Sequence, residues 1–128
     1  MARFWIIIAF GALAVIVYDT LGSIASLLFD FSYAWFMPGS LAIYVTVGFL
    51  ASKGDRVSLW KGLFAGSMIG LIDVTIGWYI SWQIGPGALQ DTELTLSLFM
   101  ETATFAIGVA TCAGLVGASI AQTIDDRG

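Results

Sequence analysis

Three carboxylic acids stand inside long apolar segments of this sequence: Asp19, Asp73 and Glu101. A carboxylate in the hydrocarbon core of a membrane is costly unless it is protonated, paired or hydrated. Acids in such places typically mark proton relays, ion pathways or contacts with another chain. No Lys, Arg or His lies in the interior of these segments to neutralise them. The three acids are therefore the candidate functional residues, for a proton, a cation or a docking partner.

The same acids have a structural interpretation as well. Neutral carboxyl groups could bond across helices, using hydroxyl groups such as those of Thr75 and Thr104. Interhelical hydrogen bonds of this kind contribute about 0.6 kcal/mol on average. This stabilisation is small compared with the cost of inserting three acids into hydrocarbon. The sequence therefore leaves both the functional and the structural interpretation open.

Several chemistries are excluded by residue types that are missing. The sequence has no histidine and a single cysteine, Cys112, which excludes the common Cys/His zinc sites, histidine-ligated haem and a Ser-His-Asp triad. Ser58 and Lys61 match a Ser-x-x-Lys pattern, but a helix cap and an interfacial anchor explain them better. We predict no enzyme, no metal and no cofactor. A net charge of −4 without a basic patch also argues against nucleic-acid binding.

The elements that position the acids are predicted by the hydropathy pattern. Of 128 residues 59% are apolar, only 11% are charged, and mean hydropathy is +0.92. Ordinary soluble domains carry roughly 25% charged residues. Each of four apolar segments supplies the roughly 20 residues that a membrane-crossing helix requires: 4–29, 33–51, 59–82 and 94–121. Short connections predict an all-α, four-helix, up-down-up-down membrane bundle, with residues 1–128 forming a single domain.

Charge distribution predicts how this bundle sits in the lipid bilayer. All five basic residues fall at the two termini or around the second connection: Arg3, Lys53, Arg56, Lys61 and Arg127. The positive-inside rule then places both termini in the cytoplasm. The first apolar segment continues past Asp19 without a convincing cleavage site, so we interpret it as a retained helix rather than a signal peptide. The expected location is the bacterial inner membrane.

Depth along the helices predicts that the acids meet. At 1.5 Å per residue, Asp19 and Asp73 lie roughly 22 and 21 Å from the inner ends of their helices, and Glu101 lies about 10 Å from the outer end of the fourth. The three acids could thus form one layer in the outer half of the bundle. Small residues at steps of three and four predict close helix packing in the third and fourth segments: Gly62, Gly66, Gly70, Gly77, Gly108 and Gly114.

A faint internal repeat joins two of the acids. The segment Asp19-Thr20-Leu21-Gly22 resembles Asp73-Val74-Thr75-Ile76-Gly77 at a period of 54 residues, with the same direction through the membrane. Duplication of a two-helix hairpin into a parallel repeat, as in some transporters, would explain this match.

Two functions remain after these exclusions. The first is a proton- or cation-linked transporter or channel-like bundle; because four short helices enclose little space, it would work as a homo-oligomer. The alternative is a non-enzymatic accessory or assembly subunit, whose acids and glycine rows dock a larger membrane-protein partner. Convergence of the acids on one polar cavity would favour the first function.

Overall fold

The computed structural model describes residues 1–54, 56–85 and 95–127, and all regular structure in these ranges is helical. Four helical stretches are long and apolar enough to cross a membrane: residues 2–29, 33–52, 59–84 and 96–125. The first is helix α1 (Ala2–Phe29), and the second joins a 3-10 turn, η1 (Tyr33–Phe36), to α2 (Met37–Ser52). The third consists of α3 (Leu59–Ile72), a π-helical turn, η2 (Asp73–Gly77), and α4 (Trp78–Ile84); the fourth is α5 (Leu96–Asp125).

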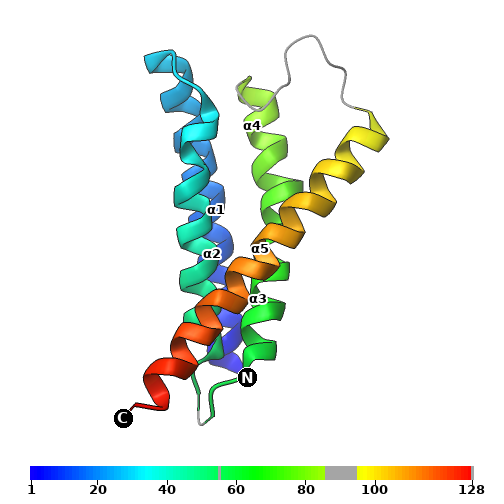
Figure 1. Cartoon of the computed structure of the whole chain (residues 1–128). Helices are drawn as coiled ribbons and strands as arrows, with labels where there is room; N and C mark the ends of the chain where they lie inside the picture. Colours follow the sequence, from blue (N-terminus) through cyan, green and yellow to red (C-terminus); the bar gives the residue numbers. More distant parts are fainter. Residues whose placement is uncertain (55, 86–94, 128) are drawn as a thin grey trace.

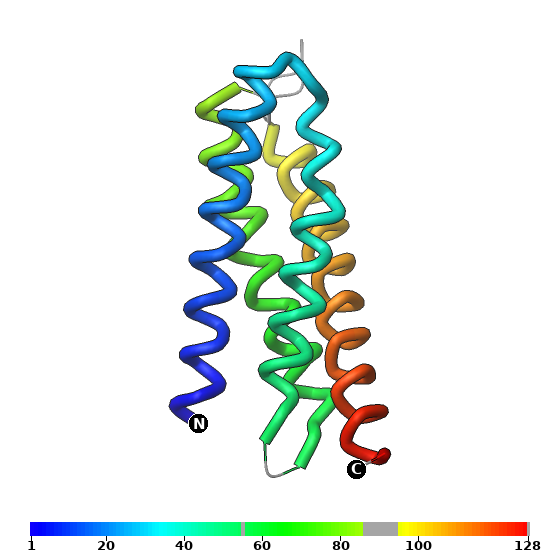
Figure 2. Tube along the Cα trace, turned by 90° about the vertical axis from the view of Figure 1, so that its left-hand side faces the viewer, coloured from blue at the N-terminus to red at the C-terminus, as the bar shows by residue number. Residues whose placement is uncertain are grey.

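The helices lie alongside one another in an elongated molecule. Figures 1 and 2 place both termini and the α2–α3 connection at one end, with the α1–η1 connection and the end of α4 at the other. Helix α5 crosses the group obliquely, so that its N-terminal half diverges from α2 (Figure 1). Its C-terminal half packs against both α2 and α3.

Small residues are buried between the helices and many large apolar side chains are exposed, which is the reverse of the pattern in soluble proteins. The buried positions of α5 are all alanine or glycine. Large apolar side chains point outward instead, among them Phe10, Leu28 and Trp60, which are 69%, 74% and 77% exposed. Many other large apolar side chains are exposed in the same way, whereas soluble monomers keep their exposed apolar patches small. Outward-facing apolar side chains and a small-residue interior suit a helix group that is surrounded by lipid.

Helices α3 and α5 pack closely through small residues. A Cβ added at Gly66 would come within 3.0 Å of backbone atoms of α5, and one at Gly114 within 3.0 Å of backbone atoms of α3. Gly62 and Gly70 face α5 in the same way, at Ala118 and Ala110. These four are among the glycines whose spacing predicts close packing, and the structure places them in this contact.

The other two predicted packing glycines lie elsewhere. Gly108 is exposed, and a Cβ added there would meet no atom of the described chain within 4 Å. Its spacing along α5 matches the row of small residues, but no neighbouring helix approaches it. Gly77 is buried, but it faces carboxyl groups rather than a neighbouring backbone.

Candidate functional site

The carboxyl groups of Asp19 and Asp73 meet beside Gly77. A Cβ added at Gly77 would lie within 3.0 Å of Oδ2 of Asp19 and of Oδ1 of Asp73. Two carboxyl oxygens this close to one point face each other across the space that the missing side chain of Gly77 leaves. Asp19 is 5% exposed and Asp73 is half-buried.

Helix direction brings the pair together. Helix α1 and the α3–α4 stretch run in the same direction (Figure 1), and α1 contacts both η2 and α4. Residues at similar distances from the same ends of two parallel helices therefore lie at the same level. The depth argument from the sequence places Asp19 and Asp73 at one level for this reason.

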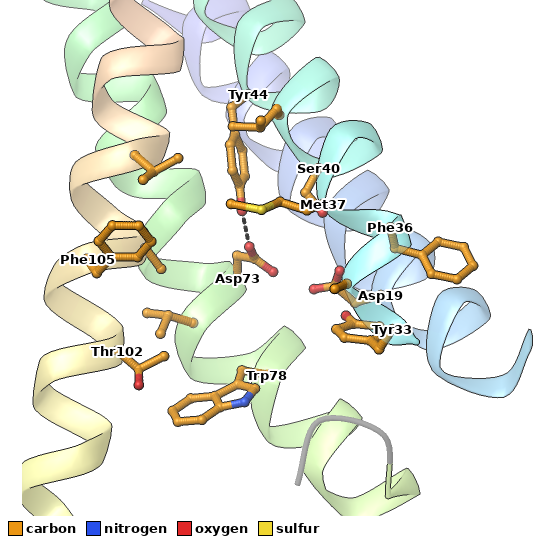
Figure 3. A pocket seen from close by; sticks show the side chains of 15 residues that line it. Asp19, Tyr33, Phe36, Met37, Ser40, Tyr44, Asp73, Trp78, Thr102 and Phe105 are labelled. Carbon is orange, nitrogen blue, oxygen red and sulfur yellow. Dashed lines mark hydrogen bonds between the residues drawn. The ribbon is translucent and has the colours of Figure 1, made fainter. Parts of the chain in front are cut away.

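Two tyrosines anchor the acids from α2 and η1. The Tyr44 hydroxyl donates a hydrogen bond to Oδ2 of Asp73 (Figure 3). The Tyr33 hydroxyl lies next to Asp19 (Figure 3) and close to Ser81. Each acid thus has its own phenol partner, supplied by the second membrane-length helical stretch.

A buried serine pair extends this network between α1 and α4. Ser23 donates from its hydroxyl to Oγ of Ser81 over 2.9 Å, and neither side chain has any exposed surface. Tyr33 lies close to both Ser81 and Asp19, so this serine pair adjoins the acid site. Within the described ranges, every buried side-chain oxygen or nitrogen has a hydrogen-bond partner. The network therefore surrounds Asp19 with polar partners inside an apolar bundle.

The π turn η2 sets the direction of Asp73 and matches the faint repeat in the sequence. Counted from its aspartate, α1 has buried Gly22 and Ser26 after three and seven residues. The α3–α4 stretch has buried Gly77 and Ser81 after four and eight. The π turn accommodates one extra residue in a helix, and such turns often occur at functional sites. One residue added in Asp73–Gly77 accounts for the different spacing.

The acid pair lines a pocket of about 220 Å³. Figure 3 shows Asp19 and Asp73 pointing into it, with Tyr33 beside the first and Tyr44 beside the second. Its walls come from the start of α2, from η1, from the π turn and α4, and from the N-terminal half of α5. Besides the two acids, the polar side chains and rings of the lining are Tyr33, Phe36, Ser40, Tyr44, Trp78, Thr102 and Phe105.

The pocket reaches the outer surface between α2 and α5. Met37 and Phe105 both line it, and they are 51% and 67% exposed. Trp78 also lines the pocket and stacks on Phe99 of α5, with ring centroids 5.8 Å apart. The side of the pocket that opens outward is therefore flanked by apolar groups, while the acids lie at its inner side.

Glu101 does not join the two aspartates, contrary to the expected three-carboxylate layer. Its side chain is exposed and accepts a hydrogen bond from the Ser97 hydroxyl of its own helix, over 3.3 Å. The neighbouring Thr102 lines the pocket instead. Successive residues of an α-helix point about 100° apart, so a correct depth does not ensure a correct direction.

The two threonines predicted as partners also lie outside the pocket. Thr75 is exposed and donates to the Leu71 carbonyl over 2.6 Å. Thr104 is exposed and donates to the Met100 carbonyl over 2.7 Å. Both hydroxyl groups bond to their own helix, as threonines commonly do in apolar helices. The partners of the acids are the tyrosines.

Sequence reasoning could have found part of this lining. Tyr44 shares a helical face with Ser40 and Gly48, which marks that face of α2 as inward. Tyr33 and Trp78 lie near the ends of apolar segments, where aromatic residues are common as interfacial anchors, so the sequence does not mark them as pocket residues. Their contacts depend on helix rotation, for which the sequence offers no separate signal.

Comparison of the chain with protein-family models, with curated proteins and with solved structures finds no match in any of the three. Its function has to be inferred from the site itself.

The residues that line this site suit a proton or a cation. All five basic residues of the chain lie elsewhere, and none lines the pocket. No group of three or more His, Cys, Asp or Glu side chains suited to a metal ion occurs in the part of the chain that the structure describes. Two carboxyl groups without a basic partner can hold a shared proton, or release it in favour of a positively charged ligand.

Proposed function

We propose that this protein is an integral membrane bundle that couples a proton to a cation at the Asp19–Asp73 pair. In this proposal its helices run up-down-up-down with both termini in the cytoplasm, because all five basic residues lie at that end. The expected setting is a bacterial inner membrane. The observation that carries the proposal is the convergence of two acids from different helices on one pocket that has no basic residue.

Charge balance suggests how the pair would work. Without a ligand, a proton shared by the two carboxyl groups limits the charge that lies in the apolar bundle. When a cation enters the pocket, its charge stabilises the ionised carboxylates, and the proton leaves. Binding of the cation and of the proton are then mutually exclusive, which is the basic requirement of exchange transport.

The surrounding hydrogen bonds suit this cycle. The phenols of Tyr33 and Tyr44 can donate to an ionised carboxylate and can rotate when it becomes protonated. Because each acid has its own phenol, either carboxylate keeps a hydrogen-bond donor when the proton moves between them. Since four helices enclose little space, we propose that a homo-oligomer completes the transport path.

Flux measurements in proteoliposomes test this function. The purified chain would be reconstituted with pyranine inside, and proton movement followed after outward or inward gradients of sodium, potassium or an alkylammonium chloride. Wild-type protein should move protons with at least one of these gradients, and Asp19→Asn and Asp73→Asn should abolish the movement. Glu101→Gln is the matched control, because that carboxyl group lies outside the pocket, and it should retain wild-type flux. Unchanged flux in both aspartate variants would refute the proposal.

One observation favours a second function, as an accessory subunit of a larger membrane complex. Ser97, Glu101, Thr104 and Gly108 follow one face of α5 at steps of four, three and four, and all four are exposed. A carboxyl group on an outward face can pair with a basic residue from another membrane helix. Since α5 begins at Leu96, Glu101 lies about 8 Å from its start, a depth that an anchoring Lys or Arg could reach.

Native-membrane mass measurements test this alternative. Protein extracted directly into lipid nanodiscs should have a mass above that of a lone chain or a homo-oligomer, and Glu101→Gln and Gly108→Leu should reduce it. A mass that fits whole copies of this chain only, unchanged in the variants, would exclude the accessory role.

A further inference from the structure

The walls around the acid pair are aromatic. Rings of Tyr33, Tyr44, Trp78 and Phe105 line the same pocket as the two carboxyl groups. They come from separate segments, η1, α2, α4 and α5, so their convergence is a property of the fold rather than of one sequence motif. Aromatic faces attract cations through their quadrupole, and they do so best for ions that carry an apolar shell.

We infer that the cation bound between these rings and the Asp19–Asp73 pair is a small organic ammonium ion. This inference rests on the proposed function, and it names the ligand class that the pocket fits. An alkylammonium or quaternary ammonium ion presents positive charge and hydrocarbon together. The carboxyl groups would balance its charge, and the rings would contact its methyl or methylene groups.

The pocket fits an inorganic cation poorly. A hard metal ion needs a shell of oxygen ligands to replace its water. Here the Tyr44 hydroxyl already donates to Asp73, Tyr33 lies beside Asp19, and the remaining walls are largely carbon. A weakly hydrated organic cation does not need that oxygen shell, because apolar contacts replace its hydration.

The open side of the pocket indicates how such a ligand would arrive. The flanking residues Met37 and Phe105 belong to α2 and α5, on the outward surface of the helix group. In a membrane this side would face lipid, from which an amphipathic cation could enter sideways. The volume of about 220 Å³ favours a compact ligand, since pockets for drug-sized molecules hold about 300–1,000 Å³.

Two sources could supply this chemistry: a free organic cation or the ammonium headgroup of a lipid. We propose the free cation, because the acids lie well inside the helices rather than at their ends. Asp19 is about 15 Å from the nearer end of α1 at 1.5 Å per residue. A lipid headgroup at that depth would have to leave the interface.

Equilibrium binding of radiolabelled benzyltrimethylammonium tests the inference. The full chain would be placed in nanodiscs of phosphatidylglycerol, which contribute no ammonium group. Binding should be saturable, and Asp19→Asn and Asp73→Asn should weaken it at least tenfold. Phe105→Leu should weaken it roughly three- to tenfold, the effect of one cation–aromatic contact. Phe64→Leu, an exposed ring outside the pocket lining, is the matched control and should bind as wild type.

Competition identifies which property of the ligand is recognised. Unlabelled tetramethylammonium should displace the label, whereas the neutral isostere neopentylbenzene should not. Equal displacement by neopentylbenzene, or by sodium or potassium at the same concentration, would overturn the inference, as would wild-type binding by both aspartate variants. Because Phe105 is exposed, Phe105→Leu should fold, so wild-type affinity in that variant also counts against the aromatic contact.

Further experiments distinguish a free cation from a lipid headgroup, and they distinguish failure of this inference from failure of the proposed function. Phosphatidylcholine nanodiscs that suppress binding would assign the site to a lipid headgroup and overturn the free-cation proposal. Flux that depends on the aspartates, without any benzyltrimethylammonium binding, would leave the proposed function standing and refute only this inference. Binding that depends on the aspartates, without flux for any cation, would support this inference and refute the proposed transport function.

Discussion

Asp19 and Asp73 are 54 residues apart in the sequence, and their carboxyl groups meet beside Gly77. The absence of a side chain at Gly77 is what allows this meeting, since a Cβ there would overlap an oxygen of each acid. Helix-packing glycines usually admit a neighbouring backbone. This one admits two carboxyl groups, so a methyl group placed there tests whether the acid pair matters.

Gly77→Ala should destabilise the protein and separate the acids. Accommodating the methyl group requires a shift of both carboxyl groups, and overpacking of this kind costs about 1–3 kcal/mol of unfolding free energy. Thermal unfolding in detergent, together with proton flux, would measure both effects. Gly108→Ala is the matched control, because a Cβ there meets no described atom within 4 Å; its stability should be unchanged or slightly higher. Equal stability of the two variants would contradict the close approach of the acids to Gly77.

Asn substitutions should separate function from stability. Asp19→Asn and Asp73→Asn keep side-chain shape and most hydrogen-bonding capacity but cannot ionise. We expect thermal stability equal to or above that of the wild type, since an acid in an apolar bundle is costly, together with lost proton flux. If the acids serve only as structural hydrogen-bond partners, flux would persist in both variants.

Tyr44→Phe should reduce flux while the protein stays folded. The variant keeps the ring that lines the pocket and removes only the hydroxyl that donates to Asp73. Hydrogen bonds to charged groups contribute about 1.5–3 kcal/mol, so a loss of roughly tenfold or more in rate is expected. Tyr79→Phe is the control, because Tyr79 is 61% exposed and does not line the pocket. Equal rates in the two variants would remove Tyr44 from the mechanism.

The buried Ser23–Ser81 pair should behave as a coupled unit. Removing either hydroxyl leaves the other without this partner, at a cost of about 1–3 kcal/mol in unfolding free energy. The double variant Ser23→Ala, Ser81→Ala should lose less than the sum of the single variants, by about 0.5 kcal/mol or more. Chemical denaturation in mixed micelles would measure the cycle. Strict additivity would show that the contact between α1 and α4 contributes no pairwise stabilisation.

Much of the fold could be predicted because it depends on runs of apolar residues, which can be read directly along the sequence. The length of each apolar run determines where a membrane-length helix begins and ends, and the four predicted segments differ from the observed stretches by at most four residues at any end. Small residues at steps of three and four predicted close packing in the third and fourth segments, and Gly62, Gly66 and Gly114 lie in the contact between α3 and α5. The rise per residue of an α-helix was enough to predict that Asp19 and Asp73 lie at the same height along their helices.

The site could be predicted only in part because it depends on helix rotation. Depth placed Glu101 near the other acids, but its direction on α5 points outward, and Thr102 takes the inward position. The π turn at Asp73–Gly77 changes rotation within a single helix, and no residue type requires it. Tyr33 reaches Asp19 from a 3-10 turn whose path depends on tertiary contacts rather than on an apolar run.

The most direct test is a count of protons released when a cation binds. Tetramethylammonium chloride would be titrated into weakly buffered, detergent-solubilised protein with a pH indicator, using sodium chloride as the ionic-strength control. If the Asp19–Asp73 pair exchanges its shared proton for a cation, the wild type should release up to one proton per site occupied, and Asp19→Asn and Asp73→Asn should release none. Equal release from the wild type and both variants, or binding to the wild type without any release, would contradict proton–cation exchange at this pair.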